Sequence, residues 1–346
     1  MVSERAAWGG LAFAIAFFAA LAVERLARRF GFVDHPGERK IHQAPMPLLG
    51  GVAIYLAVAS CVGGALWMSG TLTSGSITPA HYAGFLVGGL VLMVGGALDD
   101  RYTLPPRLSL IAPLVAAAAA VLGGIEISKV TNPFGGVLPI APWQSDVLVF
   151  AWLLVVMYTT KFLDGLDGLA TGVSAVGMGM VLGLSLTVAY FQPDVALLSS
   201  IALGATLGFL TRNFHPAKMF LGEGGSTFVG YLLGTLAVIS GGKLATALLV
   251  VGVPLLDVAW AVLRRASAGG LKNVVKADRK HLHHRLLDLG WGQRRVAVTY
   301  YLVAASFGSA ALFLQSGAKL VALSTLGLLM LVAVIILDAY DRRRQA

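Results

Sequence analysis

Residues 147–184 read VLVFAWLLVVMYTTKFLDGLDGLATGVSAVGMGMVLGL, two apolar runs joined by a short segment that contains two aspartates. Each run approaches the roughly 20 residues that an α-helix needs to cross the hydrocarbon core of a bilayer. Acids at membrane depth are costly, and they usually face a cavity and serve a function. The stretch therefore predicts two membrane-spanning helices with a functional site between them.

The composition of the whole chain is typical of a membrane protein. Of its 346 residues, 57% are hydrophobic and only 12% are charged, and the mean hydropathy is +0.79. Soluble domains are about one-quarter charged. We expect an all-α polytopic integral membrane protein, with residues 1–346 forming a single transmembrane domain of about eleven spanning helices. The expected spans are 8–26, 48–68, 82–98, 108–123, 146–163, 168–191, 195–211, 226–241, 244–263, 297–315 and 319–338.

The basic residues predict how the chain is oriented. If the loop after the first span is cytoplasmic, all but four of the 26 lysines and arginines are cytoplasmic, as the positive-inside rule requires. The exceptions are Arg5, Lys129, Lys243 and Lys319. The N-terminus is then outside and the C-terminus is in the cytoplasm. This distribution explains the formal charge of +9 without a nucleic-acid partner.

The same orientation brings all the acid-bearing loops to the cytoplasmic side. We expect the active-site loops near 27–47, 99–107, 161–168, 212–225 and 264–296. The single cysteine, Cys61, lies inside an apolar run, which excludes an intrachain disulfide and a cysteine-based metal site.

Two pairs of acids are the strongest candidates for chemistry. Asp99 and Asp100 end the third span, where the helix dipole disfavours negative charge, so their position calls for compensation. Such a pair can bind a hard cation or let one member act as a base. Asp164 and Asp167 would share a face of a helix, or line a turn that the intervening glycines permit. Lys161 could pair with Asp164 in a buried ion pair, or meet a phosphate.

A glycine-rich turn provides a further acid. Residues 212–231 read RNFHPAKMFLGEGGSTFVGY, in which Glu223 offers a carboxylate suited to a metal. Ser226 could cap the following helix, whose backbone N–H groups could then hold phosphate oxygens. A plain connecting loop is the alternative.

The cytoplasmic segment 277–291, ADRKHLHHRLLDLGW, gathers imidazole and basic groups. His281, His283 and His284 stand beside Arg285, and Arg279 and Lys280 precede them. Such a cluster could bind zinc through its histidines, but the positive charge of the neighbouring Arg and Lys residues opposes the binding of a metal cation. The composition favours contact with pyrophosphate or sugar hydroxyls, with a solvated loop as the other alternative.

Acids for a divalent cation and bases for phosphate, on a membrane scaffold, fit phosphoryl transfer between a soluble donor and a lipid acceptor. A transporter would also be apolar and polytopic, but it needs neither acids at the helix ends nor a basic histidine loop. A CDP-alcohol phosphotransferase requires D-G-x-x-A-R, whereas here Gly168 is followed by LATG.

Five segments in chain order resemble the polyprenyl-phosphate N-acetylhexosamine-1-phosphate transferase superfamily, of the glycosyltransferase family 4 type. The resemblance covers nearly the whole chain, and Asp257 in VPLLDVAW adds to it. The His-x-His-His form is similar to bacterial enzymes that start O-antigen, enterobacterial common antigen or teichoic acid linkage units, and unlike the peptidoglycan translocase I branch. The five segments are DHPGERKIHQAPMPLLGGVAIY (34–55), DD (99–100), DGLDGLA (164–170), NFHPAKMFLGEGGS (213–226) and HLHHRLLDLG (281–290).

The resemblance implies transfer of a sugar-1-phosphate from a UDP-sugar to polyprenyl phosphate, releasing UMP, with Mg²⁺ or Mn²⁺. It implies a multi-pass enzyme of the bacterial inner membrane, with its site on the cytoplasmic face, and permits a homodimer. Glu223 and Asp167 are the expected metal ligands. Asp99 is the expected base or lipid-phosphate contact. Asp100, Asp164 and Asp167 complete the catalytic acids and are expected to shape the metal and nucleotide site. The expected substrate contacts are Lys161, Asn213, Arg264, His281, His283, His284 and Arg285.

This chain departs from the family pattern at three positions. Ser109 stands where the family usually has lysine, Lys161 where it has asparagine, and Glu223 where it has aspartate. We expect Lys161 to restore the positive charge that is missing at 109 and to contact a phosphate. A catalytically inactive relative is the alternative that these departures raise.

Overall fold

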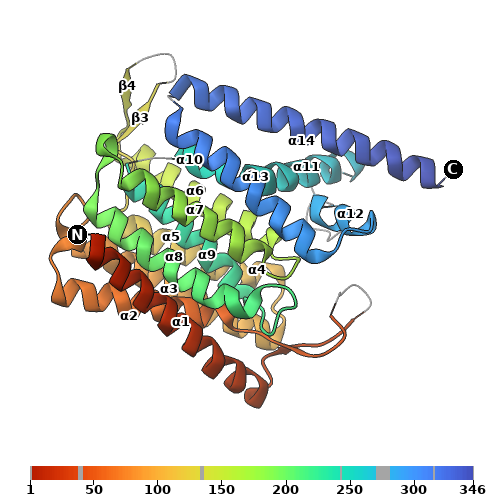
Figure 1. Ribbon diagram of the computed structural model, residues 1–346, viewed down its shortest axis with the longest axis horizontal. Coiled ribbons are helices and arrows are strands. Elements are labelled where there is room, and N and C mark those ends of the chain that lie inside the picture. The colour runs from red at the N-terminus through yellow and green to blue at the C-terminus, as the bar shows by residue number, and fades with distance from the viewer. Residues whose placement is uncertain are drawn as a thin grey trace.

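A computed structural model describes residues 2–37, 42–132, 136–241, 244–269, 281–314 and 316–345, and these are predominantly helical (Figure 1). The prediction of an all-α membrane protein is confirmed. The helices are α1 (Val2–Phe30), α2 (Gly50–Met68), α3 (Pro79–Tyr102), α4 (Pro106–Ser109), α5 (Ile111–Leu122), α6 (Pro142–Leu163), α7 (Leu169–Ser185), α8 (Pro193–Asn213), α9 (Gly222–Ile239), α10 (Leu244–Val250), α11 (Gly252–Gly269), α12 (Leu282–Asp288), α13 (Gln293–Phe313) and α14 (Ser316–Gln345).

Several helices begin where the sequence provides a start signal. Pro79, Pro142 and Pro193 occupy the first turns of α3, α6 and α8. Proline suits this position because its fixed φ is helical and its missing N–H would have had no partner there. The boundaries of these three helices therefore follow from local chemistry.

Within the described ranges, five helices are long and apolar enough to cross a membrane, namely α1, α2, α3, α6 and α8. The pair α10 and α11 counts as a sixth span if it is one broken helix, since it bends by 78° at the break. Shorter apolar helices occupy Pro106–Leu122, Leu169–Ser185 and Gly317–Val332. The expected number of about eleven spans stays a prediction.

Three expected spans have different boundaries in the structure. The 108–123 segment is divided into α4 and α5, and the 244–263 segment into α10 and α11. The 168–191 segment ends its α-helix at Ser185 and continues as a 3₁₀ turn over Val188–Tyr190. Apolar composition identified these segments, but it does not report breaks inside a buried run.

Helix α9 lies at the centre of the bundle, where it packs against α2, α3 and α6. The backbones of α2 and α3 lie close to the backbone of α9 because glycines face each other at both contacts. A Cβ on Gly51 of α2 would lie 2.1 Å from the Cα of Gly225, and a Cβ on Gly96 of α3 would lie 2.1 Å from the nitrogen of Gly224. Small residues permit such backbone contact between membrane helices. This packing holds the first turn of α9, which carries Glu223, between α2 and α3.

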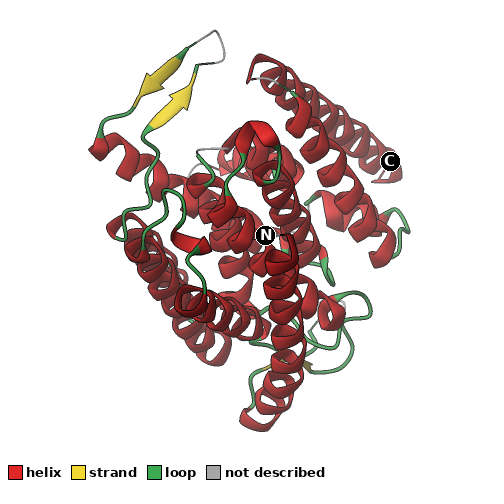
Figure 2. Cartoon of the chain, turned by 60° about the vertical axis from the view of Figure 1, so that its left-hand side comes forward, coloured by secondary structure: helices red, strands yellow, loops and turns green. Residues whose placement is uncertain are grey.

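The two ends of the bundle differ. The N-terminus and the hairpin of β3 (Lys129–Thr131) and β4 (Val137–Pro139) lie at one end, and α12 lies at the other (Figure 1). Figure 2 shows this hairpin projecting beyond the helices. At the α12 end, the loop after α1 forms the short pair β1 (Val33–Asp34) and β2 (Met46–Pro47). The acid-bearing loops open at this second end.

Candidate active site

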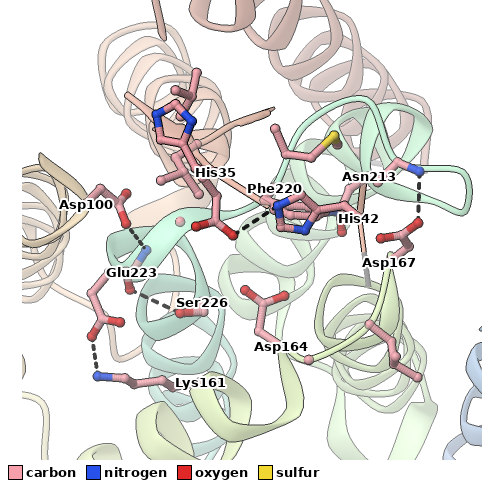
Figure 3. Close-up of a pocket in the computed structure, with 18 of the residues that line it drawn as sticks. His35, His42, Asp100, Lys161, Asp164, Asp167, Asn213, Phe220, Glu223 and Ser226 are labelled. Atoms are coloured by element: carbon pink, nitrogen blue, oxygen red, sulfur yellow. Dashed lines mark hydrogen bonds and ion pairs between the residues drawn. The ribbon is translucent and has the colours of Figure 1, made fainter. Parts of the chain in front are cut away.

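One cavity of about 1030 Å³ collects most of the residues that the sequence singles out. It lies at the ends of α3, α6 and α9, beneath the loop that contains β1 and β2 (Figure 3). Its lining includes the predicted residues Asp99, Asp100, Lys161, Asp164, Asp167, Asn213, Glu223 and His284. Loops separated by more than a hundred residues of sequence therefore meet at one site.

Asp99 is held by the turn that ends α3. Its Oδ1 accepts a hydrogen bond from the backbone N–H of Leu104 at 2.8 Å, and its Oδ2 accepts one from the hydroxyl of Ser109. Thr103 caps the helix with a left-handed φ of 48°. These donors provide the compensation that an acid at a helix C-terminus requires. Ser109 thus contacts the carboxylate of the DD motif directly.

Asp100 links α3 to the glycine-rich turn. Its Oδ1 accepts a hydrogen bond from the backbone N–H of Glu223 at 3.0 Å. Its Oδ2 is buried and has no hydrogen-bond partner among the described residues. Gly222, at a φ of 76°, is the close neighbour, and a Cβ there would lie 2.4 Å from Oδ2. A buried carboxylate oxygen without a donor is suited to a cation.

Lys161 and Glu223 form an ion pair between α6 and α9 (Figure 3). The sequence suggested Asp164 or a phosphate as the partner of Lys161, and the structure instead brings its Nζ to Glu223 Oε1. Since Ser109 contacts Asp99, positions 109 and 161 serve different carboxylates. The compensation that we expected between these two positions is therefore not direct.

Asp164 ends α6 and lies between the Lys161–Glu223 pair and Asp167 in Figure 3. It does not share a helix with Asp167, because α6 ends at Leu163 and α7 begins only after a turn. Gly168, with a φ of 72°, closes that turn. Burial raises the pKa of Asp164 from 3.8 to about 7, and the nearby charges of Glu223, Asp100 and Asp167 add to the rise.

This raised pKa predicts a pH dependence of stability. The folded protein keeps the Asp164 proton up to about pH 7, whereas the unfolded chain loses it near 3.8. Rising pH therefore favours the unfolded state across this window, and the effect levels off above it. Without divalent cation, the melting temperature in detergent should fall more steeply between pH 4 and pH 7 for the wild type than for Asp164→Asn. Parallel curves for the two proteins would contradict the assignment.

Asp167 is held on the opposite side of the cavity. Its Oδ2 lies 2.6 Å from Nδ1 of His215 and accepts a hydrogen bond from the N–H of Ala217 at 3.1 Å. Its own backbone N–H donates to Gln293 Oε1 at 3.3 Å. The NFHPAK segment and the start of α13 thus meet the DGLDG turn through these contacts.

Asn213 lines the cavity but satisfies its amide within the protein. Its Oδ1 accepts a hydrogen bond from the Thr171 hydroxyl at 2.7 Å, and its Nδ2 donates to the carbonyl of Met219 at 3.0 Å. The first contact ties the end of α8 to α7, and the second holds the segment between α8 and α9 to the end of α8. Asn213 positions that segment, and its expected contact with substrate stays a prediction.

Only one histidine of the His-x-His-His motif reaches the cavity, namely His284. His281 is buried, with its Nδ1 2.8 Å from Asp257 Oδ2, and the N–H of Leu282 donates to Asp257 Oδ1 at 2.9 Å. His283 is also buried, and its Nε2 would lie 2.7 Å from a Cβ on Gly165. Burial lowers the pKa of His283 well below its usual value, and the neighbouring histidines lower it further.

The remaining expected substrate contacts lie outside the cavity lining. Arg285 is buried in α12, and Arg264 is half-buried near the end of α11. Two basic residues named from the sequence lie outside the described residues, namely Arg279 and Lys280.

The cavity lining also includes polar residues that the sequence analysis did not name as site residues, and four of these are His35, His42, His215 and Gln293. Three of them stand inside motifs that were quoted, so their position in DHPGERKIH and NFHPAK was an available signal. Gln293 belongs to no motif. It reaches the site only because α13 begins there and packs on α7.

Ser226 does not cap helix α9 as expected. The helix begins at Gly222, and the Ser226 hydroxyl donates to the carbonyl of Glu223 within its first turn, at 3.1 Å. Three glycines made the start of this helix hard to locate from the sequence.

The donor set of the cavity fits a divalent cation. Carboxylate oxygen is the ligand that Mg²⁺ and Mn²⁺ prefer, and the unpartnered Asp100 Oδ2 is such an oxygen. Across the described ranges, no three ligating side chains already form a closed cluster. Two of the candidate ligands each have one carboxylate oxygen in contact with a basic side chain, Glu223 with Lys161 and Asp167 with His215.

The fold and the cavity define a class: helical membrane proteins with an acid-lined site at the ends of their helices. Comparison with known proteins narrows it, because residues 82–241 match the family described as glycosyl transferase family 4. The decaprenyl-phosphate N-acetylglucosaminephosphotransferase of Mycolicibacterium smegmatis is 34% identical over 96% of this chain and 87% of its own. The undecaprenyl-phosphate alpha-N-acetylglucosaminyl 1-phosphate transferase of Escherichia coli K12 is 30% identical over 82% and 77%. The chain belongs to glycosyl transferase family 4.

Proposed function

We propose that this protein transfers N-acetylhexosamine-1-phosphate from a UDP-sugar to a polyprenyl phosphate, giving polyprenyl-diphosphate-sugar and UMP. The observation that carries the proposal is the convergence of Asp99, Asp100, Asp164, Asp167 and Glu223 on one cavity of a membrane protein. The names of its relatives, which act on decaprenyl or undecaprenyl phosphate, support the lipid acceptor.

The reaction we propose is a direct displacement at phosphorus. An oxygen of the lipid phosphate attacks the β-phosphorus of the UDP-sugar, and the bond between that phosphorus and the bridging oxygen breaks. The electron pair leaves with UMP. Because the attacking oxygen is already ionised, it needs little deprotonation, and Asp99 serves mainly to orient it. Ser109 and the Leu104 N–H fix the Asp99 carboxylate for this task.

We propose Mg²⁺, or Mn²⁺, as the cofactor. We propose Glu223 and Asp167 as its ligands. The backbone N–H of Glu223 donates to Asp100 Oδ1, and the other oxygen of that carboxylate, Oδ2, has no hydrogen-bond partner among the described residues. A divalent cation there would neutralise phosphate charge as it develops. Asp164 adds negative charge to the same cavity, and His284 faces it from the histidine motif.

The proposed orientation rests on the basic residues, and the proposed location rests on the family resemblance. We propose about eleven spans in the bacterial inner membrane, with the N-terminus outside, the C-terminus in the cytoplasm and the cavity on the cytoplasmic face. Among the described basic residues, Arg101 lines the cavity, and Arg212 directly precedes the cavity residue Asn213. We also propose a single transmembrane domain over residues 1–346 and, from the family resemblance, a homodimer.

A panel of UDP-N-acetylhexosamines tests the function and identifies the donor. Purified protein is incubated with polyprenyl phosphate, Mg²⁺ and each donor, and UMP release is measured. We expect release with at least one donor, dependent on the lipid phosphate. A folded protein that releases UMP with none of them would contradict the proposal and favour an inactive relative or a transporter.

A further inference from the structure

The Lys161–Glu223 ion pair joins two of the three positions at which this chain departs from its family. The Lys161 ammonium contacts Glu223 Oε1, and about a quarter of each side chain is exposed. We propose that Lys161 competes with the divalent cation for Glu223, so that the cation binds only after the ammonium is displaced. This inference rests on the proposed function, which makes Glu223 a cation ligand.

The Lys161 ammonium and a divalent cation exclude each other at the Glu223 carboxylate, because both are positively charged. The ammonium is a compact charge that takes up the carboxylate oxygen a metal would need. At contact distance it would also repel a second cation strongly, because the site is partly shielded from water. Asparagine, the usual residue of the family at position 161, is neutral and imposes neither restriction.

Ser109, the third departure from the family pattern, contacts a different carboxylate. Ser109 contacts Asp99, so it neither relieves nor replaces the charge at Glu223. Glutamate instead of aspartate at 223 adds one methylene, which gives the carboxylate the extra reach to meet a ligand from α6. Lys161 and Glu223 therefore act as one unit, and position 109 as another.

The pair is weak enough to be opened. Partly exposed ion pairs contribute little net stability, since solvent screens them and both side chains lose freedom. Lys161 also has a second partner beside the carboxylate, because its Nζ lies 5.5 Å from the centre of the Tyr158 ring while it contacts Glu223. A cation over an aromatic face is stabilised there. The displaced ammonium can thus move towards Tyr158 while the metal takes Glu223.

The test measures Mn²⁺ binding alone, without donor or lipid acceptor. Electron paramagnetic resonance of free Mn²⁺ gives its affinity for the purified full-length protein and for Lys161→Met, which keeps the aliphatic stem without the charge. We expect Lys161→Met to bind Mn²⁺ about tenfold more tightly than the wild type. Lys161→Asn should shift the affinity in the same direction, and it serves if the methionine variant fails to fold.

A double-mutant cycle shows whether the gain in Mn²⁺ affinity depends on Glu223. In the Glu223→Gln background, Lys161→Met should give no gain in Mn²⁺ affinity. Lys218→Met removes an exposed lysine outside the cavity and should leave the affinity unchanged.

Unchanged or weaker Mn²⁺ binding in both Lys161 variants would overturn the proposal, as would a gain that persists in the Glu223→Gln background. The result does not depend on catalysis. Failure of sugar-phosphate transfer would therefore contradict the proposed function without altering the Mn²⁺ comparison.

Discussion

Asp164→Asn should lower the rate of UMP release by roughly a hundred- to a thousandfold, the loss typical of removing one preorganised charge from an active site. Asp164 lines the cavity and lies between the Lys161–Glu223 pair and Asp167 (Figure 3). Asparagine keeps the shape of the side chain, removes the charge and replaces one acceptor oxygen with an amide donor.

The same substitution should leave the protein as stable as the wild type or more stable. Burial and three neighbouring acids raise the pKa of Asp164, so its ionised form destabilises the folded state at neutral pH. Activity should be lost while the melting temperature is kept or raised. This pattern is expected where function requires a charge that destabilises the folded state.

Asp146→Asn is the matched control for this prediction. Asp146 lies on the same helix, α6, but near its other end, and it is exposed. Its substitution should change neither rate nor melting temperature. Wild-type activity of Asp164→Asn, or an equal loss in both variants, would contradict the role of Asp164.

Gly51→Ala should have the largest effect on folding. Its Cβ would lie 2.1 Å from the Cα of Gly225 and 2.6 Å from its nitrogen, so backbone rather than a flexible side chain must move. Overpacking of this kind costs about 3 kcal/mol or more. The shift would separate α2 from α9 and displace the turn that carries Glu223, so we expect a lower melting temperature and loss of activity.

Gly63→Ala provides the control within the same helix. A Cβ at Gly63 meets nothing within 4 Å, and alanine is the better helix former. Gly63→Ala should therefore keep or slightly raise the melting temperature in detergent. Equal behaviour of the two variants would show that the contact between α2 and α9 does not hold the site together.

The helical membrane fold could be predicted from the sequence because composition and run length alone exclude most alternatives. The apolar runs on either side of DGLDG fall on α6 and α7. What composition could not reveal is where buried runs break. The 78° bend between α10 and α11 falls at Val251, next to Gly252 and Pro254. These two residues are a local break signal that composition and run length do not use.

The site was predictable as a set of motifs but not as a set of contacts. The acids of three separate loops line one cavity, as their shared side of the membrane suggested. Their partners depend on tertiary geometry: Lys161 reaches Glu223, 62 residues away, rather than the nearby Asp164. Gln293 contacts the backbone of Asp167 across 126 residues, a pairing that no local pattern indicates.

The most direct test of the account follows two labels from one donor. UDP-N-acetylglucosamine carries ³²P in its β-phosphate and ³H in its sugar, and purified protein is supplied with polyprenyl phosphate and Mg²⁺. The account predicts that both labels enter the organic-extractable lipid in equal proportion while unlabelled UMP is released. Transfer of ³H alone with release of labelled UDP would contradict it, because that result means transfer of the sugar without its phosphate.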